Sequence, residues 1–259
     1  MARKKVGLAL SGGGARGLSH IGVLRVLVEH NIPIDMIAGT SAGSMVGGAF
    51  ASGMSVEEIA AMAATVRWSA VARPSLSPLG LFSNAPMANF LERHFPVKDF
   101  EGCRIPFAAV VCDFETGNEV VLETEGDLVS AIRASCAVPG VFTPLRDKNG
   151  RLLVDGGVVS PVPIDAVHRM GADVIIAVDV ISAGMAFQST PRTALGMMFQ
   201  SGMALLRAAS RNQHFHADVV IQPKIAHLRP DQIRKRDEFI ALGEEVTREN
   251  IDAIKGLIE

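Results

Sequence analysis

The chain has 259 residues, of which 48% are hydrophobic and 20% are charged. This composition supports a sizeable core and excludes an intrinsically disordered chain, and the length fits one large α/β domain or two small ones. The formal net charge of −2 argues against a nucleic-acid partner held by electrostatic attraction.

The cysteines and the apolar runs bear on the compartment. Cys103, Cys112 and Cys136 are odd in number and lack Cys-x-x-Cys spacing, as expected of thiols in a reducing compartment. The apolar run after Arg3-Lys4-Lys5 stops at Ser11-Gly12, which is too short for a signal peptide. No apolar stretch is long enough to span a bilayer. We therefore expect a cytoplasmic protein.

The first motif is a glycine-rich loop between a strand and a helix. The apolar run Val6 to Leu10 predicts the strand, and apolar residues recur with helical spacing after the loop. Gly12, Gly14 and Gly17 match the Gly-x-Gly-x-x-Gly pattern of dinucleotide sites. Such a site needs an acidic residue at the carboxyl end of the second strand, whereas Asp35 precedes that strand. A phosphate-binding Gly-Lys-Ser/Thr is also missing. The other use of such a loop is to direct backbone N–H groups at an oxyanion.

The second motif is Gly39-Thr40-Ser41-Ala42-Gly43. The apolar run from Met36 to Ala38 precedes it, and a small-residue helical pattern follows from Ala42 to Ala51. This order of strand, tight turn and helix is typical of a nucleophile elbow, in which a side chain on either flanking glycine would collide with its neighbours. The alternative is a turn whose serine only caps the helix.

The middle of the chain predicts connectors and short elements. Ser55 to Glu58 has the spacing of a capping box at the start of a helix. Residues 73–86 are rich in Pro, Ser and Gly and predict a loop, with Leu79, Leu81 and Phe82 exposed or loosely packed. An apolar loop beside a serine site is either a plain connector or a lid. A short helix is expected at residues 87–95.

A third and a fourth motif follow two further elements. A strand is predicted at 105–112, ending in Asp113, and a helix at 128–136, stopped by Pro139-Gly140. A short strand at 152–154 then leads into Asp155-Gly156-Gly157. This last motif is either an ordinary Asp-Gly turn or a carboxylate that other backbone can approach closely, as a catalytic base requires.

The remaining third of the chain continues the alternation of strands and helices. A strand at 174–180 carries Asp179 near its end, and residues 193–210 predict a Met-rich amphipathic helix. We expect this helix to pack in the core, with a membrane-touching face as the alternative. His214 and His216 alternate towards a strand at 219–222, but a metal site would need further ligands that nothing obvious supplies. Residues 237–258 predict a solvated terminal helix. No linker is visible, so one domain is expected over residues 1–259.

The chain resembles the patatin-like phospholipase family, in particular its short bacterial members related to the catalytic domain of neuropathy target esterase. The resemblance covers residues 6–179, leaving the helices and strand of 180–259 outside it. Four motifs in this order carry it: Gly12-Gly13-Gly14-Ala15-Arg16-Gly17, Gly39-Thr40-Ser41-Ala42-Gly43, Ala134-Ser135-x-x-x-Pro139 and Asp155-Gly156-Gly157.

The resemblance implies a three-layer α/β/α sandwich around a mainly parallel sheet, and a Ser–Asp dyad that cleaves lipid esters through an acyl-enzyme without a metal or other cofactor. Ser41 would be the nucleophile and Asp155 the base. The loop Gly12 to Gly17 would bind substrate, with the N–H groups of Gly13, Gly14 and Ala15 as the oxyanion hole. Arg16 either supplies a charge there or braces the loop, and bracing is favoured. Gly39, Gly43, Gly156, Gly157 and Pro139 would support the site.

The histidines agree with a dyad, because a triad needs a histidine within reach of the serine. Of the seven, His20 alone lies close to a site motif, and its position one turn into a helix suggests that it packs or braces the loop. Asp113 and Asp179 are rival carboxylates at strand ends, but neither precedes a glycine pair. The competing hypotheses are a lipid-ester hydrolase, with peripheral membrane contact as an option, and a scaffold protein that keeps the fold. The intact motifs favour the enzyme.

Overall fold

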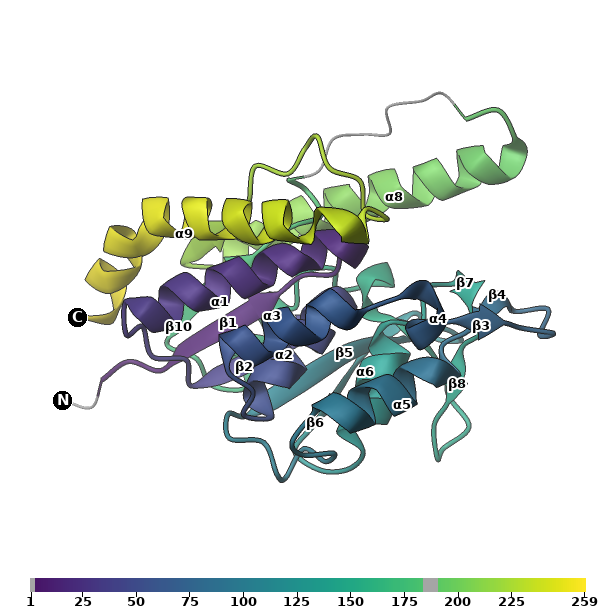
Figure 1. The fold of residues 1–259 in the computed structure, drawn as a ribbon, viewed down its shortest axis with the longest axis horizontal. Coiled ribbons are helices and arrows are strands. Elements are labelled where there is room, and N and C mark those ends of the chain that lie inside the picture. Colours follow the sequence, from purple (N-terminus) through teal and green to yellow (C-terminus); the bar gives the residue numbers. More distant parts are fainter. Residues whose placement is uncertain (1–2, 184–190) are drawn as a thin grey trace.

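The computed structural model describes residues 3–183 and 191–259 (Figure 1). Its centre is a sheet in which the described strands follow the order β11-β10-β1-β2-β5-β9-β8, with β6 paired to β5. The strands of this sheet are β1 (Val6–Leu10), β2 (Met36–Thr40), β5 (Phe107–Asp113), β6 (Asn118–Glu123), β8 (Leu145–Arg146), β9 (Leu152–Asp155), β10 (Val174–Val178) and β11 (Val219–Ile221).

The sheet is mainly parallel and carries helices on both faces. The pairs from β11 through β5 are parallel, whereas β6 and β9 run antiparallel to β5 and β8 runs antiparallel to β9. The α-helices are α1 (Ser19–Glu29), α2 (Ala42–Ala51), α3 (Val56–Thr65), α4 (Trp68–Val71), α5 (Ala85–His94), α6 (Leu128–Ser135), α7 (Ile164–Arg169), α8 (Ala194–Gln213) and α9 (Arg236–Ile258). The predicted α/β class with a mainly parallel sheet is confirmed.

Alternation along the buried strands divides the core into two layers. Leu8 and Leu10 of β1 belong to the large cluster that includes residues of α1, α2 and α9, while Ala9 between them belongs to the cluster under α7. Successive side chains of a strand point to opposite faces, so a strand covered on both sides is apolar throughout. The continuous apolar run from Val6 to Leu10 is therefore typical of a strand that is buried on both faces of the sheet.

A second, small sheet replaces the loop predicted at residues 73–86. β3 (Arg73–Pro74) pairs antiparallel with β4 (Gly80–Ser83), which pairs in parallel with β7 (Gly140–Phe142). The Trp68 ring lies 5.3 Å from the Phe82 ring and 5.9 Å from the Phe142 ring. The loop prediction was wrong because the short strand β3 has no recognisable strand pattern, and because the second partner of β4 is the distant β7, which local composition does not reveal.

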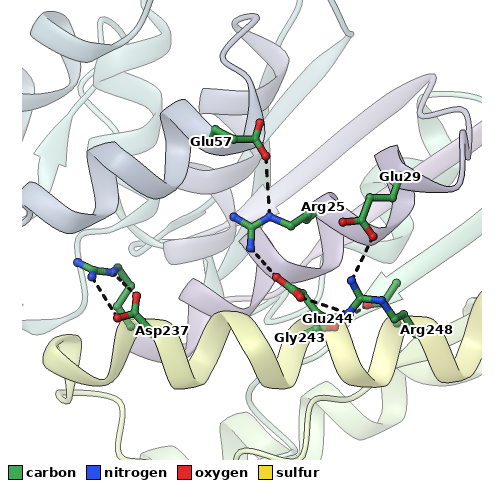
Figure 2. A network of polar contacts seen from close by, with 9 residues as sticks. Arg25, Glu29, Glu57, Asp237, Gly243, Glu244 and Arg248 are labelled. Atoms are coloured by element: carbon green, nitrogen blue, oxygen red, sulfur yellow. Dashed lines mark hydrogen bonds and ion pairs between the residues drawn. The ribbon is translucent and has the colours of Figure 1, made fainter.

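The carboxy-terminal helix α9 is not the solvated helix that the sequence predicted. It packs along α1 so closely that a Cβ on Gly243 would lie 2.1 Å from the Ser19 carbonyl oxygen. Figure 2 shows the polar contacts beside this interface, where Arg25 lies 2.5 Å from Glu244 and Arg248 bridges Glu244 and Glu29. One face of α9 is buried, including Phe239 and Ile254. The charged outer face explains why the sequence suggested solvation.

Helix α8 is less buried than predicted. Thr193 caps it, since its side chain accepts from the N–H of Gly196. Core packing was wrong for Met198, which is 71% exposed, whereas Met203 and Leu206 are half-buried. Across residues 3–183 and 191–259, no helix combines the length and the hydropathy that crossing a bilayer would demand.

Candidate active site

The register of the central sheet brings the second and fourth motifs together. β2 pairs with β5 up to Thr40 opposite Val110, and β9 continues along β5 from Asp155 opposite Val111. Thr40, directly before Ser41, and Asp155 therefore lie opposite neighbouring residues of β5. Ser41 and Asp155 are nevertheless 114 positions apart in the chain. β1 pairs with β2 on its other side, so the Gly12–Gly17 loop leaves the sheet at the same edge.

Ser41 stands in the sharp turn that the elbow motif predicts. Its backbone has φ 53° and ψ −122°, a strained conformation for a residue with a side chain. The turn leaves no room at the flanking glycines. A Cβ on Gly39 would lie 2.5 Å from the Ser44 Cα atom, and one on Gly43 would lie 2.2 Å from the Leu10 carbonyl oxygen. The strain points the Ser41 side chain out from the strand end, ahead of α2.

Asp155 is buried and faces Ser41. Its carboxylate accepts a hydrogen bond of 2.8 Å from the N–H of Gly157. Burial disfavours the ionised form and raises the pKa of Asp155 to about 6, although the Ser41 hydroxyl and the Gly157 N–H both favour the ionised form. A Cβ on Gly156 would lie 2.3 Å from the Val110 carbonyl oxygen, so this turn needs glycine to approach β5. With a pKa of about 6, most of this carboxyl group is ionised at neutral pH.

The glycine loop lies against Ser41. A Cβ on Gly12 would be 3.3 Å from the Ser41 Cβ atom, and Gly13 and Gly14 have positive φ angles of 151° and 59°. The N–H of Gly12 donates to the Pro161 carbonyl, at 3.1 Å. Within the described chain, the N–H groups of Gly13 and Gly14 donate to no backbone or side-chain acceptor. They are the loop donors left for a ligand.

The Patatin-like phospholipase family model matches residues 8–168, which is more than half of the chain. The chain belongs to the patatin-like phospholipase family. An uncharacterized NTE family protein of Mycobacterium tuberculosis is 37% identical over 209 residues, covering 78% of this chain and 57% of that protein. Human patatin-like phospholipase domain-containing protein 6 is 35% identical over 184 residues, covering 68% of this chain and 13% of that protein. The chain thus spans little more than half of one relative and a small part of the other.

The fold comparison agrees with the family. The crystal structure of VipD from Legionella pneumophila aligns with a TM-score of 0.55 and 14% identity, covering 97% of this chain and 67% of that chain. At this identity the likeness concerns the fold alone. Patatin-like phospholipases are a family of lipid acyl hydrolases, so the site at the sheet edge is interpreted below in terms of that chemistry.

Arg16 and Ala15 tie the loop to the segment before α9. The Arg16 guanidinium donates two hydrogen bonds to the Leu228 carbonyl, of 3.1 and 2.9 Å, and the Ala15 N–H donates to the Pro230 carbonyl at 2.8 Å. Arg16 is buried, and desolvation lowers its pKa from the ordinary arginine value. Arg16 braces the loop, as favoured from the sequence. Gly17 lies at the loop's far end against α2, where a Cβ would be 2.5 Å from the Ala42 Cβ atom.

His20 also supports the loop. Its Nε2 lies 2.9 Å from the Ser11 carbonyl oxygen, so Nε2 carries the hydrogen and donates. Complete burial is the main reason why its pKa falls to about 4. A neutral ring held this way has no hydrogen bond to Ser41.

The two rival carboxylates have other partners. Asp113 accepts from the N–H of Glu115, at 3.1 Å, in the turn after β5. Asp179 accepts from the hydroxyls of Ser182 and Ser210 and from His214, whose Nε2 is 2.7 Å away. These hydrogen bonds lower the pKa of Asp179 although burial alone would raise it. Asp179 therefore anchors the end of α8 to the sheet.

His214 and His216, which were considered for a metal site and not assigned to one, contact different partners. His214 faces Asp179, whereas His216 contacts Asp165 at 2.9 Å. In the described parts of the chain, no group of three or more His, Cys, Asp or Glu side chains is placed to hold a metal ion.

Ser135 is a site residue whose part the sequence did not predict. Its hydroxyl accepts from the Ser41 N–H, at 2.8 Å, and donates to the Val110 carbonyl, at 2.7 Å. It therefore fixes the strained elbow to β5. The signal was the third motif, Ala134-Ser135-x-x-x-Pro139, which predicted a shaping role without naming the contact. Pro139 itself lies just before β7 of the small sheet.

Proposed function

We propose that the chain is a serine acyl hydrolase that cleaves carboxylic ester bonds of lipids through a Ser41–Asp155 dyad. The observation that carries this proposal is that the strained Ser41 and the buried Asp155 meet along β5, beside a loop with two unused N–H donors. Membership in a family of lipid acyl hydrolases supports the substrate class. Phospholipids and lysophospholipids are the esters we expect.

In the first half of the reaction, the Ser41 Oγ atom attacks the ester carbonyl while its proton passes to Asp155. The tetrahedral intermediate collapses, and the alcohol or lysolipid leaves with that proton. In the second half, Asp155 takes a proton from water as the water oxygen attacks the acyl-enzyme carbonyl. The second tetrahedral intermediate collapses, and Asp155 returns the proton to the Ser41 Oγ atom as the fatty acid leaves. Asp155 is suited to this exchange because its pKa of about 6 lies nearer neutrality than that of an exposed carboxyl.

The oxyanion of each intermediate would be held by the N–H groups of Gly13 and Gly14. The sequence proposed Ala15 as a third donor, but its N–H already donates to Pro230. Backbone donors that point into a site before substrate arrives need no reorganisation during the reaction. The α2 helix, which begins directly after Ser41, adds favourable partial positive charge at its N-terminus.

The test is labelling of the protein with a fluorophosphonate, followed by hydrolysis of a panel of esters. We expect Ser41→Ala to abolish labelling and turnover, and Asp155→Asn to lower kcat by about 10²–10⁴-fold, with circular dichroism unchanged. The matched controls His20→Gln and Asp113→Asn should retain the larger part of the activity. A folded Asp155→Asn protein with near wild-type kcat, beside an inactive His20→Gln protein, would overturn the dyad.

Calcium and zinc are not required by this chemistry. Backbone N–H groups stabilise the negative charge of the oxyanion, and the Asp155 carboxylate accepts the serine proton. Hydrolysis of a p-nitrophenyl ester should be unchanged by a chelator. Loss of activity with chelator and its return with calcium or zinc would contradict the mechanism.

A further inference from the structure

Large apolar side chains are left uncovered on two elements outside the central sheet. One element is the segment from α4 to β4, and the other is α8. Among the described residues, seven large apolar side chains on these two elements are between 51% and 105% exposed: Trp68, Leu76, Leu79, Leu81, Met197, Met198 and Leu205. Isolated exposed apolar residues are common, but a concentration on two elements indicates an interaction surface.

Both elements lie at the end of the molecule where the parallel strands have their carboxyl ends. In Figure 1, β3, β4 and the amino-terminal end of α8 extend to the right, beyond the carboxyl ends of the parallel strands. β4 pairs with β7 at Gly80 and Gly140, next to Pro139 of the third motif. On α8, the Leu206 Cδ1 atom is 3.4 Å from the position of a Cβ on Gly157. The two uncovered elements therefore lie at the end of the molecule that carries Ser41 and Asp155.

The charge of these elements differs from that of the chain. The whole chain has 27 acidic residues and a net charge of −2, yet residues 59–91 contain Arg67 and Arg73 and no Asp or Glu. Residues 191–217 likewise contain Arg192, Arg207 and Arg211 and no Asp or Glu. Arg67, Arg73 and Arg192 are exposed beside the apolar side chains. A chain with a negative net charge thus has two cationic and apolar elements at the end that carries the site.

We propose that this α8–β4 surface docks on an anionic lipid bilayer and brings the site to its substrate. Leu, Met and Trp side chains enter the interface between headgroups and acyl chains, and arginines bind anionic headgroups there. The charge pattern selects this occupant, since a second copy of the chain would have to offer an acidic partner surface. The purpose of the docking rests on the proposed hydrolase function, whereas the docking itself does not.

The test is flotation of the Ser41→Ala protein with phospholipid vesicles, so that no hydrolysis alters the lipid. The vesicles contain phosphatidylcholine alone or with about 30 mol % phosphatidylglycerol, which sets the negative surface potential. We expect binding to the anionic vesicles, much weaker binding to the neutral ones, and a decrease as salt is raised.

Two sets of substitutions in the Ser41→Ala protein separate the apolar and the charge contributions. Leu76→Gln/Leu81→Gln/Met198→Gln should weaken binding by about 30-fold or more, because three side chains no longer enter the bilayer. Arg73→Gln/Arg192→Gln should weaken binding to anionic vesicles by about 25-fold, at about fivefold for each arginine. Unchanged unfolding temperatures confirm that these surface variants fold.

The matched controls lie elsewhere on the surface. Val28→Gln replaces an apolar side chain on α1 that is 47% exposed, and Arg93→Gln/Arg104→Gln removes two exposed charges near Gly53, close to the amino-terminal end of β5. Both should bind vesicles like the parent protein.

Absence of vesicle binding, equal binding of all variants, or equal binding to neutral and anionic vesicles would overturn the proposal. The proposal would also be overturned if the protein did not bind vesicles but formed a dimer that the same substitutions dissociate. A second copy of the chain would then cover the surface. If the wild-type protein floats with vesicles but is not labelled by fluorophosphonate, the proposed hydrolase function is contradicted and the proposed membrane docking is supported.

Discussion

The substitution Asp155→Asn should stabilise the folded protein at neutral pH while it removes activity. The pKa of Asp155 is raised from 3.8 to about 6, mainly by burial. Folding therefore favours the protonated carboxyl. The stability contributed by that form is fully present below pH 3.8 and is lost as pH rises through about 6. At neutral pH the wild-type protein holds a buried charge that the amide does not carry.

The magnitude follows from the shift. A difference of about 2 pKa units corresponds to about 3 kcal/mol, which is the ionisation penalty that Asn removes at pH 7.5. At pH 4.5 most of the folded protein is already protonated, and the same linkage leaves a difference of about 1 kcal/mol. For a chain of this size, about 3 kcal/mol corresponds to a rise in Tm of about 5–10 °C. The Asn oxygen can still accept from Gly157, so the turn is retained.

The assay is urea unfolding of the wild-type and Asp155→Asn proteins at both pH values, with Asp113→Asn as the control at another strand end. We expect the stability gain of Asp155→Asn to grow by about 2 kcal/mol between pH 4.5 and 7.5, and that of the control to stay small. A gain that does not depend on pH, or a loss of stability at pH 7.5, would refute the claim that the site holds its base in an unfavourable ionised form.

The remaining predictions concern the pH profile and the local geometry. The acid limb of kcat/KM should have its midpoint near the pKa of Asp155, about 6, because only the ionised carboxylate accepts the proton; a limb insensitive to Asp155→Asn would contradict this. Ser135→Ala leaves the Ser41 N–H and the Val110 carbonyl without a partner, so it should cost about 1–3 kcal/mol in urea unfolding and lower kcat. Gly43→Ala places a Cβ against the Leu10 carbonyl and should prevent folding or abolish fluorophosphonate labelling, whereas Gly202→Ala, with open space around it on α8, should stabilise by up to about 1 kcal/mol.

The sequence by itself determined the elements whose pattern is local. The strand Val6–Leu10 and the helix Ala42–Ala51 have the predicted bounds, since an uninterrupted apolar run and a small-residue helical period leave few alternatives. The capping box at Ser55 and Glu58 was readable for the same reason, because its two hydrogen bonds join residues three positions apart. The four motifs identified the family, which the family model confirms.

The tertiary structure decided everything that depends on which segments meet. Glycine spacing at Gly39 and Gly43 predicted a tight turn, but the register of β2 and β9 on β5 is what puts Asp155 beside Ser41. The pairing of β4 with β7 and the buried face of α9 were missed, because their partners are distant in the chain. The exposure of α8 was missed because amphipathic spacing shows that one face is apolar and does not show what covers it. Burial likewise sets the pKa of Asp155, and a sequence pattern records no burial.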